Sequence, residues 1–113
     1  MNYETRCCKI RLKPGSIEKV RAWAQTINER KDEALATLRD ESVILEIVFL
    51  DQTAEGDFLI YLLKAENFEK AQEAVRHSAH AIDEYHRNFK QACWTDGAPL
   101  ETLVDLDRIS EIK

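Results

Sequence analysis

Four stretches of the chain have the residue patterns of β-strands, either alternation of hydrophobic and polar positions or a short apolar run. The four stretches are residues 7–13, 43–50, 58–63 and 100–106. In the first, Cys8, Ile10 and Leu12 alternate with Lys9 and Arg11. The two middle stretches are apolar at nearly every position, and the short polar segment between them predicts a hairpin.

Two longer segments have the 3.6-residue period of amphipathic helices. Ser16 is a suitable N-cap for the first helix. Its apolar stripe is interrupted at Lys31, so we expect this helix to bend or restart near residues 28–32. The second helix is predicted to begin near Asn67, with an apolar stripe that continues to Cys93. The predicted order is therefore strand, helix, strand, strand, helix, strand.

This order predicts a single α+β domain over residues 1–113 with the ferredoxin-like βαββαβ fold. Two main helices should cover one face of a four-stranded antiparallel sheet, which we expect to form half of a dimeric α/β barrel. A chain of 113 residues is long enough to bury one hydrophobic core.

The second and third predicted strands are apolar on both faces, although helices are expected on only one. On the second strand, one face carries Val43, Leu45, Ile47 and Phe49, and the other carries Ile44, Val48 and Leu50. A monomer rarely leaves so large an apolar patch exposed. We therefore expect a second copy to cover the free face as a homodimer. The alternative is that the first residues or the C-terminal tail of the same chain cover it.

Polar side chains on these strands predict a small-molecule pocket. Arg11 and Lys9 should point away from the helices, where Glu46 and Tyr61 would join them if the strand phases agree. A few polar groups within an apolar cavity are typical of ligand sites. In a catalytic version, Arg11 or Lys9 would hold a substrate carboxylate or enolate. The alternative is an ion pair of Glu46 with one of the two basic residues, because buried charges require partners.

Composition and charge limit the kinds of binding partner and cellular location that we expect. The net charge of −5 argues against binding to nucleic acid, which requires a basic surface. No apolar run approaches the roughly 20 residues of a membrane span, and the N-terminus does not resemble a signal peptide, so we expect a cytoplasmic protein. The odd number of cysteines argues against a disulfide framework. We expect Cys7, Cys8 and Cys93 to be packing thiols, the alternative being a redox or metal role.

His80, Asp83 and His86 form the most distinctive polar cluster. On the predicted helix Asp83 is three residues from each imidazole and can contact either one. His86 falls at the centre of the apolar stripe, where a buried imidazole needs a hydrogen-bonding partner. Three interpretations follow: a structural His86, a catalytic acid or base oriented by Asp83, or a metal site. The spacing contains no established metal motif, so we assign no metal ligand and leave the cofactor unknown.

Four short motifs carry a resemblance to a known family. They are Cys8-x-Ile10-x-Leu12-Lys13-Pro14-Gly15, Glu46-x-x-Phe49-Leu50, Gly56-Asp57-x-Leu59-Ile60-Tyr61 and His80-x-Ile82-Asp83-x-x-His86. With them the chain resembles an uncharacterised bacterial family of short proteins within the dimeric α/β-barrel superfamily. The resemblance implies a fold but no activity, because this superfamily includes monooxygenases, haem-degrading enzymes and proteins of unclear role. In that family a proline usually follows the first histidine, at a position that favours a helix start; this chain has Ala81.

The sequence thus predicts a protein of unknown function with a ligand-binding or acid/base site between the sheet and the second helix. The candidate residues are His80, Asp83 and His86 for acid–base chemistry, and Arg11, Glu46 and Tyr61 for ligand contacts. The alternative is a non-catalytic interaction protein in which the histidine cluster only stabilises the fold. Whether the protein is an enzyme is left open.

Overall fold

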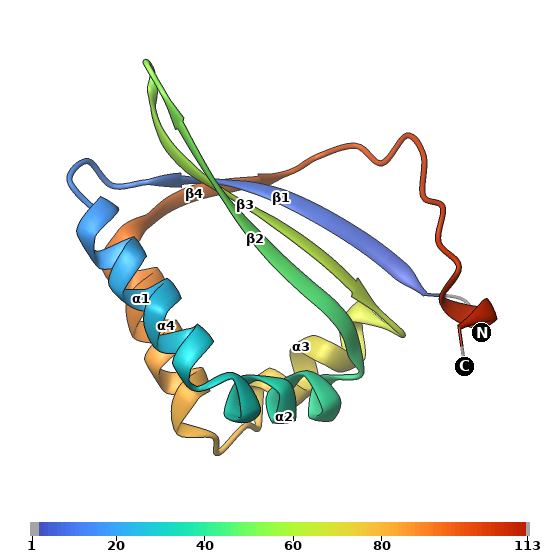
Figure 1. Ribbon diagram of the computed structural model, residues 1–113. Coiled ribbons are helices and arrows are strands. Elements are labelled where there is room, and N and C mark those ends of the chain that lie inside the picture. Colours follow the sequence, from blue (N-terminus) through green and yellow to red (C-terminus); the bar gives the residue numbers. More distant parts are fainter. Residues whose placement is uncertain (1–2, 113) are drawn as a thin grey trace.

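The computed structural model describes residues 3–112, which form an α+β structure with four helices on one side of a four-stranded antiparallel sheet (Figure 1). The strands are β1 (Glu4–Leu12), β2 (Val43–Thr53), β3 (Gly56–Ala65) and β4 (Trp94–Pro99), in the sheet order β2-β3-β1-β4. The helices are α1 (Ile17–Glu29), α2 (Lys31–Glu41), α3 (Phe68–Arg76) and α4 (Ala81–Cys93), and a short 3-10 helix, η1, spans Ile109–Glu111. No helix within residues 3–112 combines the length and apolar character that crossing a membrane requires.

Each predicted helical segment is divided into two helices. The predicted restart in the first segment is confirmed, since α1 and α2 meet at Arg30. The second segment is not the continuous helix that we predicted, because α3 and α4 are separated by a short loop. In this loop the Ser78 hydroxyl donates to the Asp83 carboxylate and accepts a 3.1 Å bond from the His80 backbone N–H. The helix that follows begins at Ala81 without the proline of the resembled family. As a result, α4 packs on α1 and α3 packs on α2.

The predicted strand at residues 100–106 is wrong, because the fourth strand comes earlier. β4 follows α4 without a loop and pairs antiparallel with β1. Gly97 permits this close pairing with Ile10, since a Cβ atom at Gly97 would lie 2.4 Å from the Ile10 Cδ1 atom. The alternation that suggested a strand therefore belongs to an irregular segment beyond the sheet.

This C-terminal segment is held by a buried lysine on β3. Lys64 is 6% exposed, and its ammonium pairs with Asp105 at 2.8 Å and with Asp107. The carboxylates therefore face the sheet, while Leu103 and Leu106 are 83% and 88% exposed. The segment covers only one end of the free sheet face.

The core lies between the helices and the inner face of the sheet. As predicted, Ile10 and Leu12 of β1 face the helices, and they are buried with Leu59 of β3 and Phe89 of α4. The alternate residues of β1, β2 and β3 face away from the helices. On this outer face Phe49 remains 55% exposed. The strands are apolar on both faces, and within residues 3–112 the outer apolar face stays uncovered.

Candidate functional site

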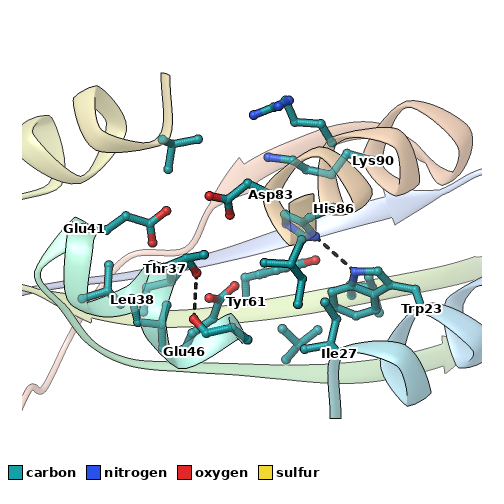
Figure 2. Close-up of a pocket in the computed structure, with 18 of the residues that line it drawn as sticks. Trp23, Ile27, Thr37, Leu38, Glu41, Glu46, Tyr61, Asp83, His86 and Lys90 are labelled. Atoms are coloured by element: carbon teal, nitrogen blue, oxygen red, sulfur yellow. Dashed lines mark hydrogen bonds between the residues drawn. The ribbon is translucent and has the colours of Figure 1, made fainter. Parts of the chain in front are cut away.

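A cavity of about 950 Å³ lies between the inner face of the sheet and the helices (Figure 2). All four helices and all four strands contribute to its walls, which are mostly apolar. Its polar lining groups include Glu41 of α2, Glu46 of β2, Tyr61 of β3, and Asp83 and His86 of α4. The cavity lies between the sheet and the helices, and not on the free face of the sheet, to which the polar strand residues were expected to point.

Two of the three strand residues predicted to contact a ligand line this cavity. Glu46 and Tyr61 lie on the inner face of neighbouring strands, whereas Arg11 projects from the outer face with Lys9. The strand phases therefore do not bring the four side chains together as predicted. The alternative ion pair of Glu46 is not formed either, since Lys9 Nζ lies 3.5 Å from Asp51 Oδ2 on the outer face.

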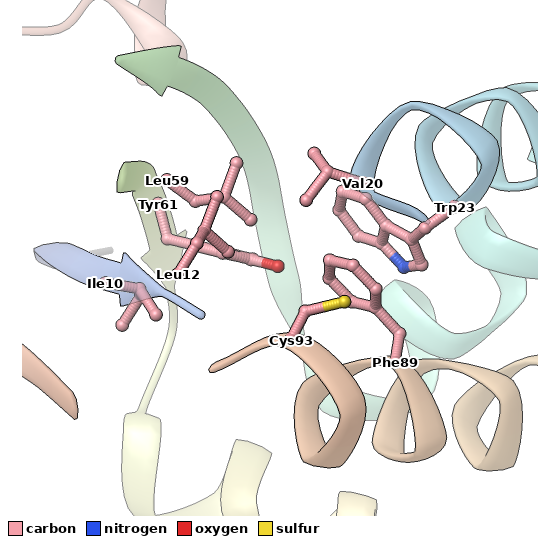
Figure 3. Close-up of a cluster of buried hydrophobic side chains, with 8 residues drawn as sticks. All are labelled: Ile10, Leu12, Val20, Trp23, Leu59, Tyr61, Phe89 and Cys93. Atoms are coloured by element: carbon pink, nitrogen blue, oxygen red, sulfur yellow. The ribbon is translucent and has the colours of Figure 1, made fainter. Parts of the chain in front are cut away.

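His86 is held by an indole rather than by a carboxylate. Trp23 Nε1 donates a 3.2 Å hydrogen bond to His86 Nδ1, and Trp23 stacks in turn on Phe89 of the buried cluster in Figure 3. Because an indole N–H can only donate, the neutral imidazole carries its proton on Nε2. Burial, with a smaller effect of Lys90, lowers the pKa of His86 to about 4. At neutral pH His86 is therefore an uncharged hydrogen-bond donor and has no free nitrogen to act as a base.

The predicted contact between Asp83 and His86 is not formed. The Asp83 carboxylate accepts the Ser78 hydroxyl proton instead, although both Asp83 and His86 line the cavity. His80 precedes α4 and turns away from the cavity, where its Nε2 lies 2.7 Å from Asp40 Oδ2. This hydrogen bond raises the pKa of His80. The break in the helix thus separates His80 from the other two members of the predicted cluster.

Glu41 is the cavity residue that sequence reasoning missed. Burial, together with the negative charges of Asp83 and Glu46, raises the pKa of the Glu41 carboxyl to about 7. Burial also raises the pKa of Glu46. Protein surrounds most of this side chain, but water still reaches it through the open cavity. No signal in the sequence marks Glu41, because a glutamate at the end of a polar helix is typical of a solvated surface.

Two aromatic side chains bring unpaired polar atoms to the cavity wall. Within residues 3–112, neither the Tyr61 hydroxyl nor Trp94 Nε1 has a hydrogen-bond partner, although both atoms are buried. The Tyr61 and Trp94 rings meet edge to face with centroids 5.2 Å apart, and His86 lies 6.3 Å from each. Burial, and then the charge of Glu46, raises the pKa of Tyr61, so its hydroxyl stays protonated. Buried polar groups are normally paired, so these two atoms lack the partners that their burial calls for.

The described residues offer no preformed metal centre. Within residues 3–112, no three or more His, Cys, Asp or Glu side chains are arranged to hold a metal ion. The three cysteines are free thiols on β1 and at the end of α4. The arrangement is instead a mostly apolar chamber whose wall also carries carboxyl groups, basic groups and aromatic side chains with polar atoms.

Comparisons with known proteins establish the family and leave the activity open. The crystal structure of PA3566 from Pseudomonas aeruginosa aligns with a TM-score of 0.55 over 88% of this chain and 93% of that chain. At 12% sequence identity, this likeness concerns the fold alone. No curated protein matches the sequence. The sequence profile of a family of unknown function, DUF6176, matches residues 3–111. The chain therefore belongs to this family of unknown function.

Proposed function

We propose that this protein binds a small organic molecule in the cavity between the sheet and the helices. The observation that carries the proposal is a mostly apolar cavity of about 950 Å³ that contains buried polar atoms without partners. Small-molecule sites have volumes of roughly 300 to 1,000 Å³ and combine apolar walls with a few polar groups. Packed protein cores, in contrast, contain few voids larger than a water molecule.

The chemistry of the lining supports a ligand rather than an accidental packing defect. Glu41 and Glu46 are held where burial disfavours their ionised forms. The Tyr61 hydroxyl is buried without a partner. Each of these groups has a higher free energy in the ligand-free protein than it would have in water. A bound molecule that pairs with them would offset this cost.

Fluorescence provides a direct test, because both tryptophans of the chain, Trp23 and Trp94, line the cavity. A library of small organic molecules is screened by tryptophan fluorescence and thermal shift, and hits are titrated. Ala34→Phe fills the cavity from α2, whereas Ala22→Phe adds the same ring on the exposed side of α1. We expect Ala34→Phe, and not Ala22→Phe, to abolish binding. Hits that bind both variants equally, or the absence of any hit, would contradict the proposal and favour a purely structural or interaction protein.

Acid–base catalysis on the bound molecule is the second candidate, and Glu41 favours it. A carboxyl with a pKa of about 7 is matched to proton transfer at neutral pH. This assignment gives the proton-transfer role to Glu41 and leaves His86 as a hydrogen-bond donor. Incubation of a cavity ligand with the protein, followed by product analysis, would test it. Turnover that persists in Glu41→Gln would contradict the assigned role.

We further propose that the domain is ferredoxin-like and assembles as a dimeric α/β barrel. Support comes from the sheet order β2-β3-β1-β4 and from the exposed apolar outer face, where Ile47 is 43% and Phe49 is 55% exposed. Analytical ultracentrifugation should then give twice the 13.1 kDa mass of one chain. Phe49→Asp should yield monomers, whereas Gln52→Asp on the same strand should not. A wild-type monomer at micromolar concentration would contradict the dimer.

We also propose a cytoplasmic location. The thiols of Cys7, Cys8 and Cys93 are free, as expected of a protein in a reducing compartment. Fractionation of cells that express the protein would test this location, and recovery in an extracellular or periplasmic fraction would contradict it.

A further inference from the structure

Three carboxyl groups from three different elements meet on one side of the cavity. Glu41 ends α2, Glu46 lies on β2 and Asp83 lies in the first turn of α4 (Figure 2). Glu41 is close enough to the other two for their charges to act on it. Within residues 3–112 none of the three forms an ion pair with a basic side chain. This side of the cavity therefore brings together three acidic groups that have no ion-pair partner within residues 3–112.

Within residues 3–112, none of the basic residues that line the cavity forms an ion pair with these carboxyl groups: Arg6, Arg21, Lys31, Arg76, Arg87 and Lys90. Lys90 acts on Glu46, but its Nζ lies over the Trp94 ring, 5.0 Å from the centroid. Arg6 lies over the Phe68 ring in the same way, with Cζ 4.4 Å from the centroid. These two cations are thus held on aromatic rings, and Arg76 pairs with Glu73 at 2.8 Å.

A second, independent observation comes from Tyr61. This residue is only 5% exposed, lines the cavity, and has a hydroxyl that makes no hydrogen bond within residues 3–112. It lies on the same sheet face as Glu46, on the neighbouring strand. A buried hydroxyl without a partner is unfavourable. Its position beside a carboxylate indicates where a polar atom of a ligand would be placed.

We infer that the cavity binds an organic cation: an ammonium group on an apolar body. The inference rests on the proposed function and adds the chemical class of the ligand. The ammonium N–H groups would donate to the carboxylates of Glu41 and Glu46 and to the Tyr61 oxygen. The Tyr61 ring itself meets the Trp94 ring with centroids 5.2 Å apart, and aromatic faces of this kind attract cations. The apolar walls would contact the hydrocarbon part of the ligand.

The test uses matched probes that differ only in their polar group. Four triplets share a skeleton and end in an ammonium, a hydroxyl or a carboxylate: benzylamine, benzyl alcohol and benzoate, with the corresponding phenethyl, cyclohexylmethyl and hexyl compounds. Binding is measured by tryptophan fluorescence and by saturation-transfer NMR. We expect at least one ammonium probe to bind about tenfold or more tightly than its alcohol, as a charge-assisted hydrogen bond implies, and the carboxylates to bind least.

Variants identify the groups responsible. Glu46→Gln and Tyr61→Phe should each weaken binding of the ammonium probe several-fold and leave binding of the alcohol nearly unchanged. Glu84→Gln removes a carboxylate from the exposed face of α4 and is the charge-matched control, with no expected effect. Equal or tighter binding of the alcohols or carboxylates in the cavity would overturn the cation assignment and leave the proposed function intact. Failure of all twelve probes would overturn the cation assignment, whereas failure of the wider library as well would overturn the proposed function.

Discussion

Replacement of Glu41 by glutamine should make the protein more stable at alkaline pH. In the folded state the pKa of Glu41 is about 7, against an ordinary value of 4.5. Between these two values the folded chain keeps the proton that the unfolded chain releases, so the wild type loses stability as the pH rises through this range. The loss between pH 5 and pH 8 is roughly 2 to 3 kcal/mol, the lower figure allowing for solvent that enters the cavity. Glutamine has nearly the same shape and cannot ionise, so the variant lacks this loss.

The assay is urea unfolding of the wild type and Glu41→Gln at pH 5 and pH 8. The difference between the two proteins should change by roughly 2 to 3 kcal/mol between the two pH values, in favour of the variant at pH 8. Titration of His86 is common to both proteins and cancels in this comparison. Glu84→Gln controls for the loss of one negative charge. A difference that stays constant with pH would refute the reasoning, because it would mean that Glu41 ionises as freely in the fold as in water.

Other substitutions test single contacts of the account. His86→Ala should lower the free energy of unfolding by about 2 to 4 kcal/mol, because it leaves Trp23 Nε1 unpaired and removes a stacked ring. His86→Gln keeps an acceptor and should lower it less. Equal losses of the two variants in urea unfolding would contradict the role of the hydrogen bond. Because the pKa of His86 is about 4 when folded and 6.5 ordinarily, its protonation favours the unfolded chain. The wild type should therefore lose up to roughly 3 kcal/mol between pH 6.5 and pH 4 through this group, and a His86→Gln variant with the same loss would contradict this. Gly97→Ala should lower Tm, since the buried Ile10 side chain must turn its Cδ1 atom away from the new Cβ, and an unchanged Tm would show that Ile10 repacks without cost. Lys64→Ala should speed proteolysis of the C-terminal segment that Lys64 anchors, and unchanged cleavage rates would show that other contacts hold this segment.

Much of the fold could be predicted because it depends on local periodicity. The apolar face of β1, the β2–β3 hairpin and the helix restart near Arg30 all follow from patterns within a few residues. Features that depend on distant or specific contacts could not be predicted. The break before α4 involves a Ser78–Asp83 hydrogen bond, and the place of β4 depends on how closely Ile10 approaches Gly97. Neither contact leaves a periodic signal.

The candidate site, like the fold, could be predicted only in part from the sequence. The position of His86 at the centre of an apolar stripe indicated an imidazole that needs a partner; His86 is half-buried, and its partner is Trp23, 63 residues away in sequence. Arg11 was grouped with Glu46 because the relative phase of two strands cannot be read from alternation alone. Glu41 was missed because its altered pKa arises from the cavity around it, and the cavity forms only when α2 is placed over the sheet.

Chemical-shift mapping of a bound molecule by NMR tests the central claim most directly. The wild-type protein is titrated with the tightest ligand found by fluorescence, and the perturbed backbone and methyl signals are assigned. The account predicts saturable changes at residues that line the cavity, such as Ile27, Leu38 and Val48, and none at Ala22 on the exposed side of α1. Changes confined to the outer sheet face around Ile47, or no saturable change at any residue, would contradict it.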